Sequence, residues 1–134
     1  MTNYVKIFND HFMEFVEDII QVFPNEVNLI AGKNSLVLVK KSNPRLILKF
    51  FQEFIYDKYK VEIMNGDIDY FLNKDYMDDC KICKNVDSIN KILESINKIK
   101  EPIKKMNSEE KEKVVKYMQN LIKIIDLFIN TITK

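Results

Sequence analysis

Two cysteines three positions apart form a pattern that is associated with metal and redox chemistry. Cys80 and Cys83 make a single C-x-x-C pair, and the chain has no other cysteine. A structural zinc site needs four ligands, and the sole histidine, His11, lies far back in the sequence. A thioredoxin-like motif would open a helix after a strand, in a βαβ setting that the sequence lacks. We expect two reduced cysteines, no bound metal and no cofactor.

One histidine–carboxylate pair has a spacing suited to acid–base chemistry. His11 and Glu14 are separated by about one helical turn, so their side chains can meet. No other polar group gathers around His11 in the sequence. We therefore expect a histidine on the surface or in a groove of an amphipathic helix, no catalytic residues, and a protein that is not an enzyme.

An acidic segment follows the middle of the chain and raises the question of a cation site. Its members are Asp67, Asp69, Asp75, Asp78 and Asp79. An EF-hand loop requires glycine at its sixth position and glutamate at its twelfth, whereas here Gly66 precedes the aspartates and that glutamate is missing. Helix capping by Asp67 and a solvated acidic edge explain the segment better than calcium.

The strongest basic block covers residues 33–60, where lysines alternate with aromatic residues. The lysines are Lys33, Lys40, Lys41, Lys49, Lys58 and Lys60. Charge combined with stacking platforms is typical of single-stranded nucleic-acid binding. At helical spacing, however, aromatic residues usually face the core. The chain also has a single arginine, so recognition of nucleic-acid bases by bidentate arginine contacts is unfavourable. A nucleic-acid accessory factor is therefore the alternative function, not the leading one.

The composition indicates one helical domain spanning residues 1–134. Of the 134 residues, 46% are apolar and 31% are charged, which suffices for a sizeable core. Two glycines and three prolines provide little material for the turns of a sandwich or barrel, and none for a glycine-rich phosphate loop. Neither a membrane helix nor a secretory signal is expected, so we predict an intracellular, reducing location without membrane association.

The first two expected helices differ in the clarity of their patterns. Apolar residues recur every three or four positions over residues 4–23, with Asn3 placed as the cap. Residues 26–41 also favour a helix, although Gly32 weakens a helix and the run Leu36-Val37-Leu38-Val39 has strand character. The alternative for residues 36–51 is a hairpin that pairs Leu36–Lys41 with Leu46–Phe51.

A third, aromatic helix is expected from Pro44 to about Met64, because Asn43-Pro44 is a typical helix start. Asn65-Gly66 can end it in a left-handed conformation. Asp67 is placed to cap a short helix over residues 68–73, and residues 74–85 are expected to form a loop or a loosely helical connector.

The last third of the chain carries two apolar seams with steps of three and four residues. They comprise Ile89, Ile92, Ile96, Ile99, Ile103 and Met106, then Val114, Met118, Leu121, Ile125, Phe128 and Ile132. A short connection at Asn107-Ser108 predicts an antiparallel helical hairpin, with Pro102 kinking its first helix or removing one hydrogen bond. A second stripe, formed by Val115, Ile122 and Ile129, widens the apolar surface of the last helix.

Four segments together resemble a family of short uncharacterised proteins encoded by nucleocytoplasmic large DNA viruses, the giant viruses. The segments are IFNDHFMEFVEDIIQVFP at 7–24, KNSLVLVKKSNPRLILKFF at 33–51, NGDIDYFLNKDY at 65–76 and EPIKKMNSEEKEKVVKYMQNL at 101–121. The resemblance covers most of the chain except residues 77–95. It implies an all-helical fold and a setting in the host cytoplasm, a virus factory or the virion, and it supplies no catalytic residues.

These patterns predict an all-α fold: a compact bundle of about five helices that ends in an antiparallel helical hairpin docked on the aromatic third helix. Wide apolar helix faces without a convergent polar site favour a non-enzymatic protein-interaction or assembly module of a large DNA virus. The expected partner is a protein or a second copy of the chain, giving a homodimer. Val115, Ile122 and Ile129 are the predicted contact residues if the fold leaves them uncovered.

Overall fold

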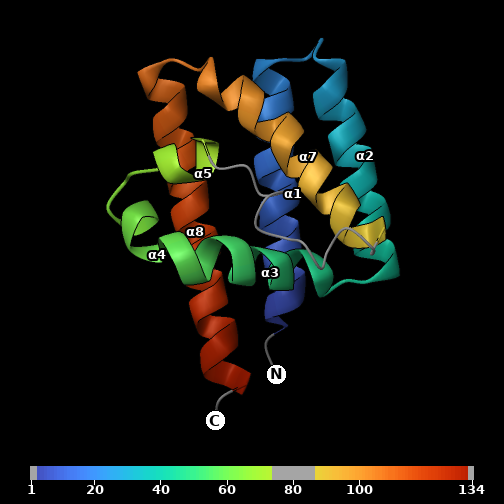
Figure 1. The fold of residues 1–134 in the computed structure, drawn as a ribbon, viewed down its shortest axis with the longest axis vertical. Coiled ribbons are helices and arrows are strands. Elements are labelled where there is room, and N and C mark those ends of the chain that lie inside the picture. The colour runs from blue at the N-terminus through green and yellow to red at the C-terminus, as the bar shows by residue number, and fades with distance from the viewer. Residues whose placement is uncertain (1–2, 74–86, 133–134) are drawn as a thin grey trace.

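The computed structural model describes residues 3–73 and 87–132, and every regular element in those ranges is helical. This confirms the all-α fold class (Figure 1). Within the described part of the chain, no helix is both long and apolar enough to cross a bilayer. The elements are α1 (Tyr4–Val22), α2 (Val27–Ser42), α3 (Leu46–Phe51), the π-helical segment η1 (Gln52–Tyr56), α4 (Asp57–Met64), α5 (Asp69–Asn73), α7 (Asp87–Lys104) and α8 (Ser108–Ile132).

Helix α1 forms as the sequence predicts and lies at the centre of the fold. The Asn3 side chain accepts a hydrogen bond from the backbone N–H of Lys6 at 3.1 Å, which satisfies one of the unpaired N–H groups of the first turn. Phe8 and Phe12 are buried, and both rings meet Phe51 of α3 at centroid distances of 5.6 and 5.5 Å. α1 contacts α2, α3, α7 and α8, so its aromatic face organises the core.

Residues 36–42 belong to α2, so the alternative hairpin over residues 36–51 is wrong. The run Leu36-Val37-Leu38-Val39 is accommodated in a helix because Leu36 and Val39 are buried on its packed side, where tertiary contacts outweigh a weak strand preference. Gly32 lies on the same side and brings the backbone of α2 close to Ser95 of α7. Packing, rather than intrinsic propensity, decides the conformation of this segment.

The aromatic third helix begins at Leu46, two residues later than predicted, and contains a π-helical turn. An uninterrupted α-helix would continue the buried face of Phe51 and Phe54 toward Lys58 and Val61. The π turn contains one residue more than an α-helical turn and so rotates the buried face by one position along the sequence. As a result, Ile63 is buried and Val61 is exposed. Hydrophobic burial therefore stabilises a helical irregularity that periodicity alone does not reveal.

The turn after α4 and the start of α5 follow the prediction. Gly66 adopts a φ of 89°, a conformation that residues with a Cβ rarely adopt. The Asp67 side chain then accepts a hydrogen bond from the backbone N–H of Asp69 at 3.0 Å. The predicted connector over residues 74–85 lies outside the described residues.

The connection between α7 and α8 is short, as predicted, and a capping box that was not predicted closes the start of α8. Asn107 and Glu110 form a reciprocal capping box: the Glu110 N–H donates to the Asn107 side chain at 2.8 Å, and the Asn107 N–H donates to the Glu110 carboxylate at 3.1 Å. α7 continues through Pro102, which has no N–H to donate to Lys98.

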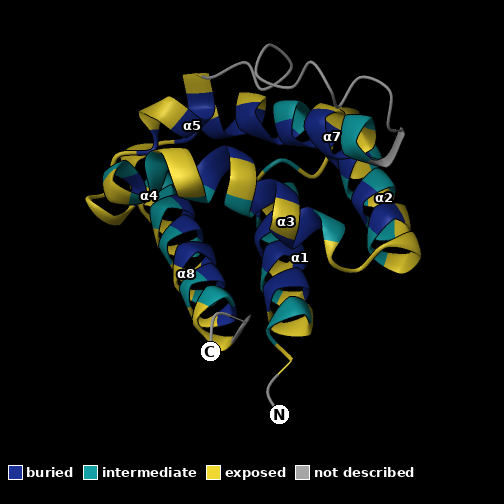
Figure 2. Cartoon of the chain, turned by 60° about the horizontal axis from the view of Figure 1, so that its bottom comes forward, coloured by how far each residue is buried: buried dark blue, intermediate teal, exposed yellow. Residues whose placement is uncertain are grey.

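The packing partners of α7 and α8 differ from the predicted hairpin. α7 packs mainly on α2, and α8 packs mainly on α1, so the two helices diverge from their turn instead of lying seam to seam (Figures 1 and 2). The two predicted seams are buried against other helices, except that Ile89 is only partly buried and that the side chain of Ile132 lies outside the described part of the chain. A seam pattern shows that a helix needs an apolar neighbour and does not specify which neighbour provides it. α8 does reach the aromatic third helix, through η1 and α4.

Substituting alanine at the two glycines is expected to change stability in opposite directions. At Gly32 an added Cβ meets Ser95 at 3.7 Å, an ordinary contact, so Gly32→Ala should stabilise the fold by up to about 1 kcal/mol through helix propensity. At Gly66 the positive φ makes Gly66→Ala destabilising by about 1 kcal/mol. Thermal unfolding followed by circular dichroism measures both changes.

Gly32→Leu is the control for the close approach of α2 and α7. It should destabilise the fold, because the branched leucine side chain cannot fit between the two helices. A stabilised Gly32→Leu variant would contradict this packing.

Candidate functional site

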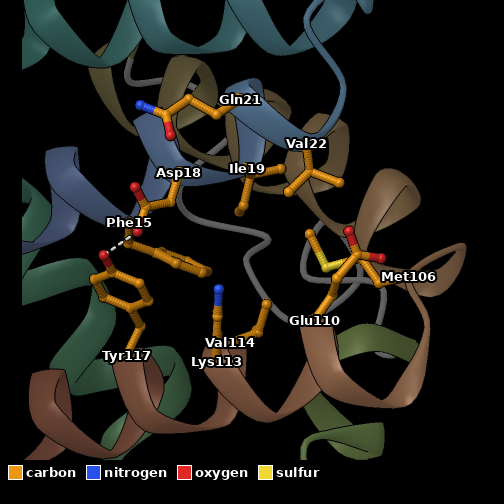
Figure 3. Close-up of a pocket in the computed structure, with 10 residues that line it drawn as sticks. All are labelled: Phe15, Asp18, Ile19, Gln21, Val22, Met106, Glu110, Lys113, Val114 and Tyr117. Carbon is orange, nitrogen blue, oxygen red and sulfur yellow. Dashed lines mark hydrogen bonds between the residues drawn. The ribbon is translucent and has the colours of Figure 1, made fainter.

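A cavity of about 260 Å³ opens between the C-terminal half of α1 and the start of α8 (Figure 3). Its floor is apolar and its rim carries charge, with Asp18 on α1 and Glu110 and Lys113 on α8. The lining residues are Phe15, Asp18, Ile19, Gln21, Val22, Met106, Glu110, Lys113, Val114 and Tyr117. The cavity exists because α8 leaves α7 at their shared turn and follows α1 instead.

Tyr117 of α8 holds one edge of this cavity. Its hydroxyl donates a hydrogen bond to the Asp18 carboxylate and lies 3.4 Å from the Glu14 carboxylate, while its ring lies 5.3 Å from that of Phe15. Burial, the hydrogen bond to Asp18 and the two nearby negative charges raise the pKa of Tyr117 well above its ordinary value of 10.0. The phenol is therefore held protonated and acts as a donor that links α8 to α1.

His11 and Glu14 lie on the same face of α1, as their spacing predicted. The Nδ1 atom of His11 is 3.9 Å from a Glu14 carboxylate oxygen, and the imidazole packs 5.1 Å from the Tyr117 ring. Its Nε2 atom is buried without a hydrogen-bond partner in the described structure, and His11 is not part of the cavity lining. His11 is therefore partly buried on the side of α1 that faces α8, where its ring packs against Tyr117.

A second polar cluster joins α8 to the aromatic third helix. Lys60 Nζ lies 2.7 Å from Asp126 Oδ1 and 3.1 Å from the Tyr56 hydroxyl, which itself donates to Asp126. Burial opposes ionisation of Asp126, but the hydrogen bonds from Lys60 and Tyr56 and the lysine charge outweigh it and lower the pKa of the carboxyl. The hydrogen bond to Asp126 is likewise the main cause that raises the pKa of Lys60.

The predicted basic block does not converge on a single set of unengaged lysines. Lys60 belongs to the cluster with Asp126, and Lys33 pairs with Glu17 of α1 at 3.1 Å. Lys49 lies over the Phe128 ring at 5.4 Å, and Lys58 lies over the Phe54 ring at 5.9 Å. Lys40 and Lys41 occupy the last turn of α2. Four of the six lysines are thus engaged with groups of this chain.

The stripe predicted for partner contact on α8 is not left uncovered. Ile122 is fully buried in the core, and Val115 and Ile129 are partly buried against it. The stripe is covered because α8 packs on two sides, against α1 and against α4 with η1. The condition for self-association through these three residues is therefore not met.

Metal-binding geometry is not found in residues 3–73 and 87–132, where no three histidine, cysteine or acidic side chains gather. Cys80 and Cys83, together with Asp75, Asp78 and Asp79, lie outside the described residues. Asp67 caps α5, as predicted.

An exposed apolar stripe on α2 is the feature that sequence reasoning missed. Val27, Ile30 and Leu38 are 75%, 41% and 59% exposed, and successive spacings of three and eight residues place them on one face of the helix. The opposite face carries Leu29, Leu36 and Val39, which are buried. The sequence signal for this stripe is that residues 27–42 carry apolar side chains on both faces of the helix. We call Val27, Ile30 and Leu38 the α2 stripe.

We expect Tyr117→Phe to destabilise the protein by about 1 kcal/mol at neutral pH, because the substitution removes one hydrogen bond to a carboxylate. The difference from wild type should shrink as pH rises above about 10: there the unfolded phenol ionises, while the folded phenol, with its raised pKa, does not. Urea unfolding at pH 7 and pH 10.5 measures this difference. Tyr70→Phe is the control, because that tyrosine is exposed; a pH-independent difference for Tyr117→Phe would contradict the assignment.

Comparisons with known proteins do not identify the chain further. No family model, no curated protein and no solved structure matches it.

Proposed function

We propose that the protein is a non-enzymatic interaction module that docks a protein partner on the α2 stripe and serves the assembly of a large DNA virus. The observation that carries this proposal is the exposure of three large apolar side chains on one face of a single helix. Isolated exposed apolar residues are normal, whereas an aligned set on one element is typical of an interaction surface.

The energetics favour a partner helix or sheet on this face. Complete burial of a valine, leucine or isoleucine side chain stabilises a complex by about 1.5–3 kcal/mol relative to exposure. Part of this stabilisation is available to a complex at the α2 stripe, because its three side chains are 75%, 41% and 59% exposed.

The setting in a large DNA virus, within a virus factory or virion, rests on the resemblance of the four sequence segments. The alternative function, a nucleic-acid accessory factor using residues 33–60, has weaker support. Ion pairs at Lys33 and Lys60 and ring contacts at Lys49 and Lys58 already engage most of the basic block. A nucleic-acid ligand would have to compete with these contacts.

Leu38→Glu should reduce partner recovery by roughly tenfold or more, because an unpaired carboxylate would be buried at the contact. The matched control is Val61→Glu on α4, which changes a side chain that is 68% exposed and lies outside the α2 stripe. Tagged wild type and both variants would be expressed in infected host cells, and the recovered proteins would be quantified by mass spectrometry.

The expected result is a defined set of partners that is retained by Val61→Glu and lost by Leu38→Glu. Circular dichroism verifies that both variants keep the helical fold. Equal recovery by all three proteins would reject the α2 stripe as the docking surface.

A further inference from the structure

We infer that the partner seated on the α2 stripe is a second copy of this chain, with the two α2 helices antiparallel about a two-fold axis at Asn34. This inference rests on the proposed function, because it names the occupant of the same surface. It moves the expected self-association from α8, where Ile122 is buried, to α2.

The spacing of the α2 stripe suits such a pairing. Asn34 lies between Ile30 and Leu38, four residues from each, and is exposed on the same face. An antiparallel register centred on Asn34 places Ile30 of each copy beside Leu38 of the other and brings the two Asn34 side chains together. A two-fold contact requires this self-complementarity, since one patch must fit its own copy.

Asn34 itself favours a specific register. Its side chain makes no hydrogen bond in the described structure, so its amide is available to a partner. An asparagine placed among apolar contacts between two helices fixes their alignment, because any shift leaves a buried amide unpaired. Two facing asparagines can each donate to and accept from the other.

The charges at the ends of α2 are complementary in the same register. Glu26 precedes the first turn and Lys41 lies in the last turn, and neither has an ion-pair partner among the described residues. The antiparallel arrangement brings Lys41 of one copy next to the Glu26–Val27 end of the other, twice by symmetry. A parallel arrangement would instead set each charge beside its like.

The size of the contact indicates a weak, reversible dimer. A helix of 16 residues is about 24 Å long, and one such pair buries less area than a standard stable interface. We expect dissociation in roughly the micromolar to millimolar range, where assembly responds to local concentration.

Analytical ultracentrifugation of the purified full-length chain over a range of concentrations tests the dimer. Wild type and Val61→Glu should move from monomer to dimer as concentration rises, while Leu38→Glu should stay a monomer. A wild type that remains monomeric at the highest concentration overturns the inference, and so does a dimer that Leu38→Glu leaves intact.

Charge reversal tests the orientation independently of any apolar substitution. Glu26→Lys and Lys41→Glu should each weaken the dimer by severalfold, and the double variant should restore it, because the pair is recreated with its signs exchanged. Failure of the double variant to recover overturns the antiparallel register.

Cysteine crosslinking locates the axis. In a background carrying Cys80→Ser and Cys83→Ser, Asn34→Cys should form a disulfide-linked dimer upon mild oxidation, since the two copies of residue 34 meet at the axis. Val61→Cys is the exposed control and should remain monomeric. Equal crosslinking of both variants overturns the inferred interface.

These outcomes separate the inference from the proposed function. A monomeric wild type whose Leu38→Glu variant still loses its partners in infected cells contradicts the second-copy inference and leaves the docking function intact. If wild type is monomeric and the Leu38→Glu variant also retains all partners, the result contradicts both the second-copy inference and the docking function.

Discussion

The aromatic face of α1 is the contact on which the rest of the fold depends. Phe8 and Phe12 meet Phe51 edge to face, an arrangement that the ring quadrupoles favour, and Phe15 continues the buried row toward Tyr117. Because α1 is contacted by α2, α3, α7 and α8, it sets the positions of the helices around it. Loss of one of these rings would leave a void that several helices would have to fill at once.

α7 and α8 separate because the apolar face of α1 must be covered by other helices, and α8 is one of the helices that cover it. α7 and α8 each carry a long apolar seam. Two such seams on consecutive helices can pack against each other or against other helices of the chain. The described structure uses the second solution: α8 covers the aromatic face of α1, and α7 meets α2 at the close approach of Gly32 and Ser95. The cavity beside Tyr117 follows from this divergence, as do the polar links that join α8 to α1 and to η1 with α4.

Apolar residues on both faces of α2 have different consequences for folding and for function. The inner face supplies the core, which explains why a segment with mixed helix and strand propensities still becomes a helix. The outer face contributes less to the packing of the chain on itself, since Val27, Ile30 and Leu38 remain 75%, 41% and 59% exposed. Apolar residues beyond what the core needs carry a cost in solubility, and binding to a partner is a physical reason to keep them.

The sequence by itself determined the helical class, most helix boundaries and the caps, because these depend on local interactions. Asn3, Asp67 and the Asn107–Glu110 pair satisfy backbone groups within a few residues of themselves, and Gly66 supplies a backbone conformation that other residues avoid. Such contacts can be read from neighbouring residue types without knowledge of the fold.

Only the tertiary structure decided which apolar face meets which neighbour. Ile122 and Leu38 are similar in type and both lie on helices with extra apolar residues, yet one is fully buried and the other is largely exposed. The π-helical turn at residues 52–56 and the pairing of Lys60 with Asp126 across 66 positions are equally non-local. Burial is a property of the assembled helices, so a pattern along one helix reports the need for a partner but cannot specify the partner.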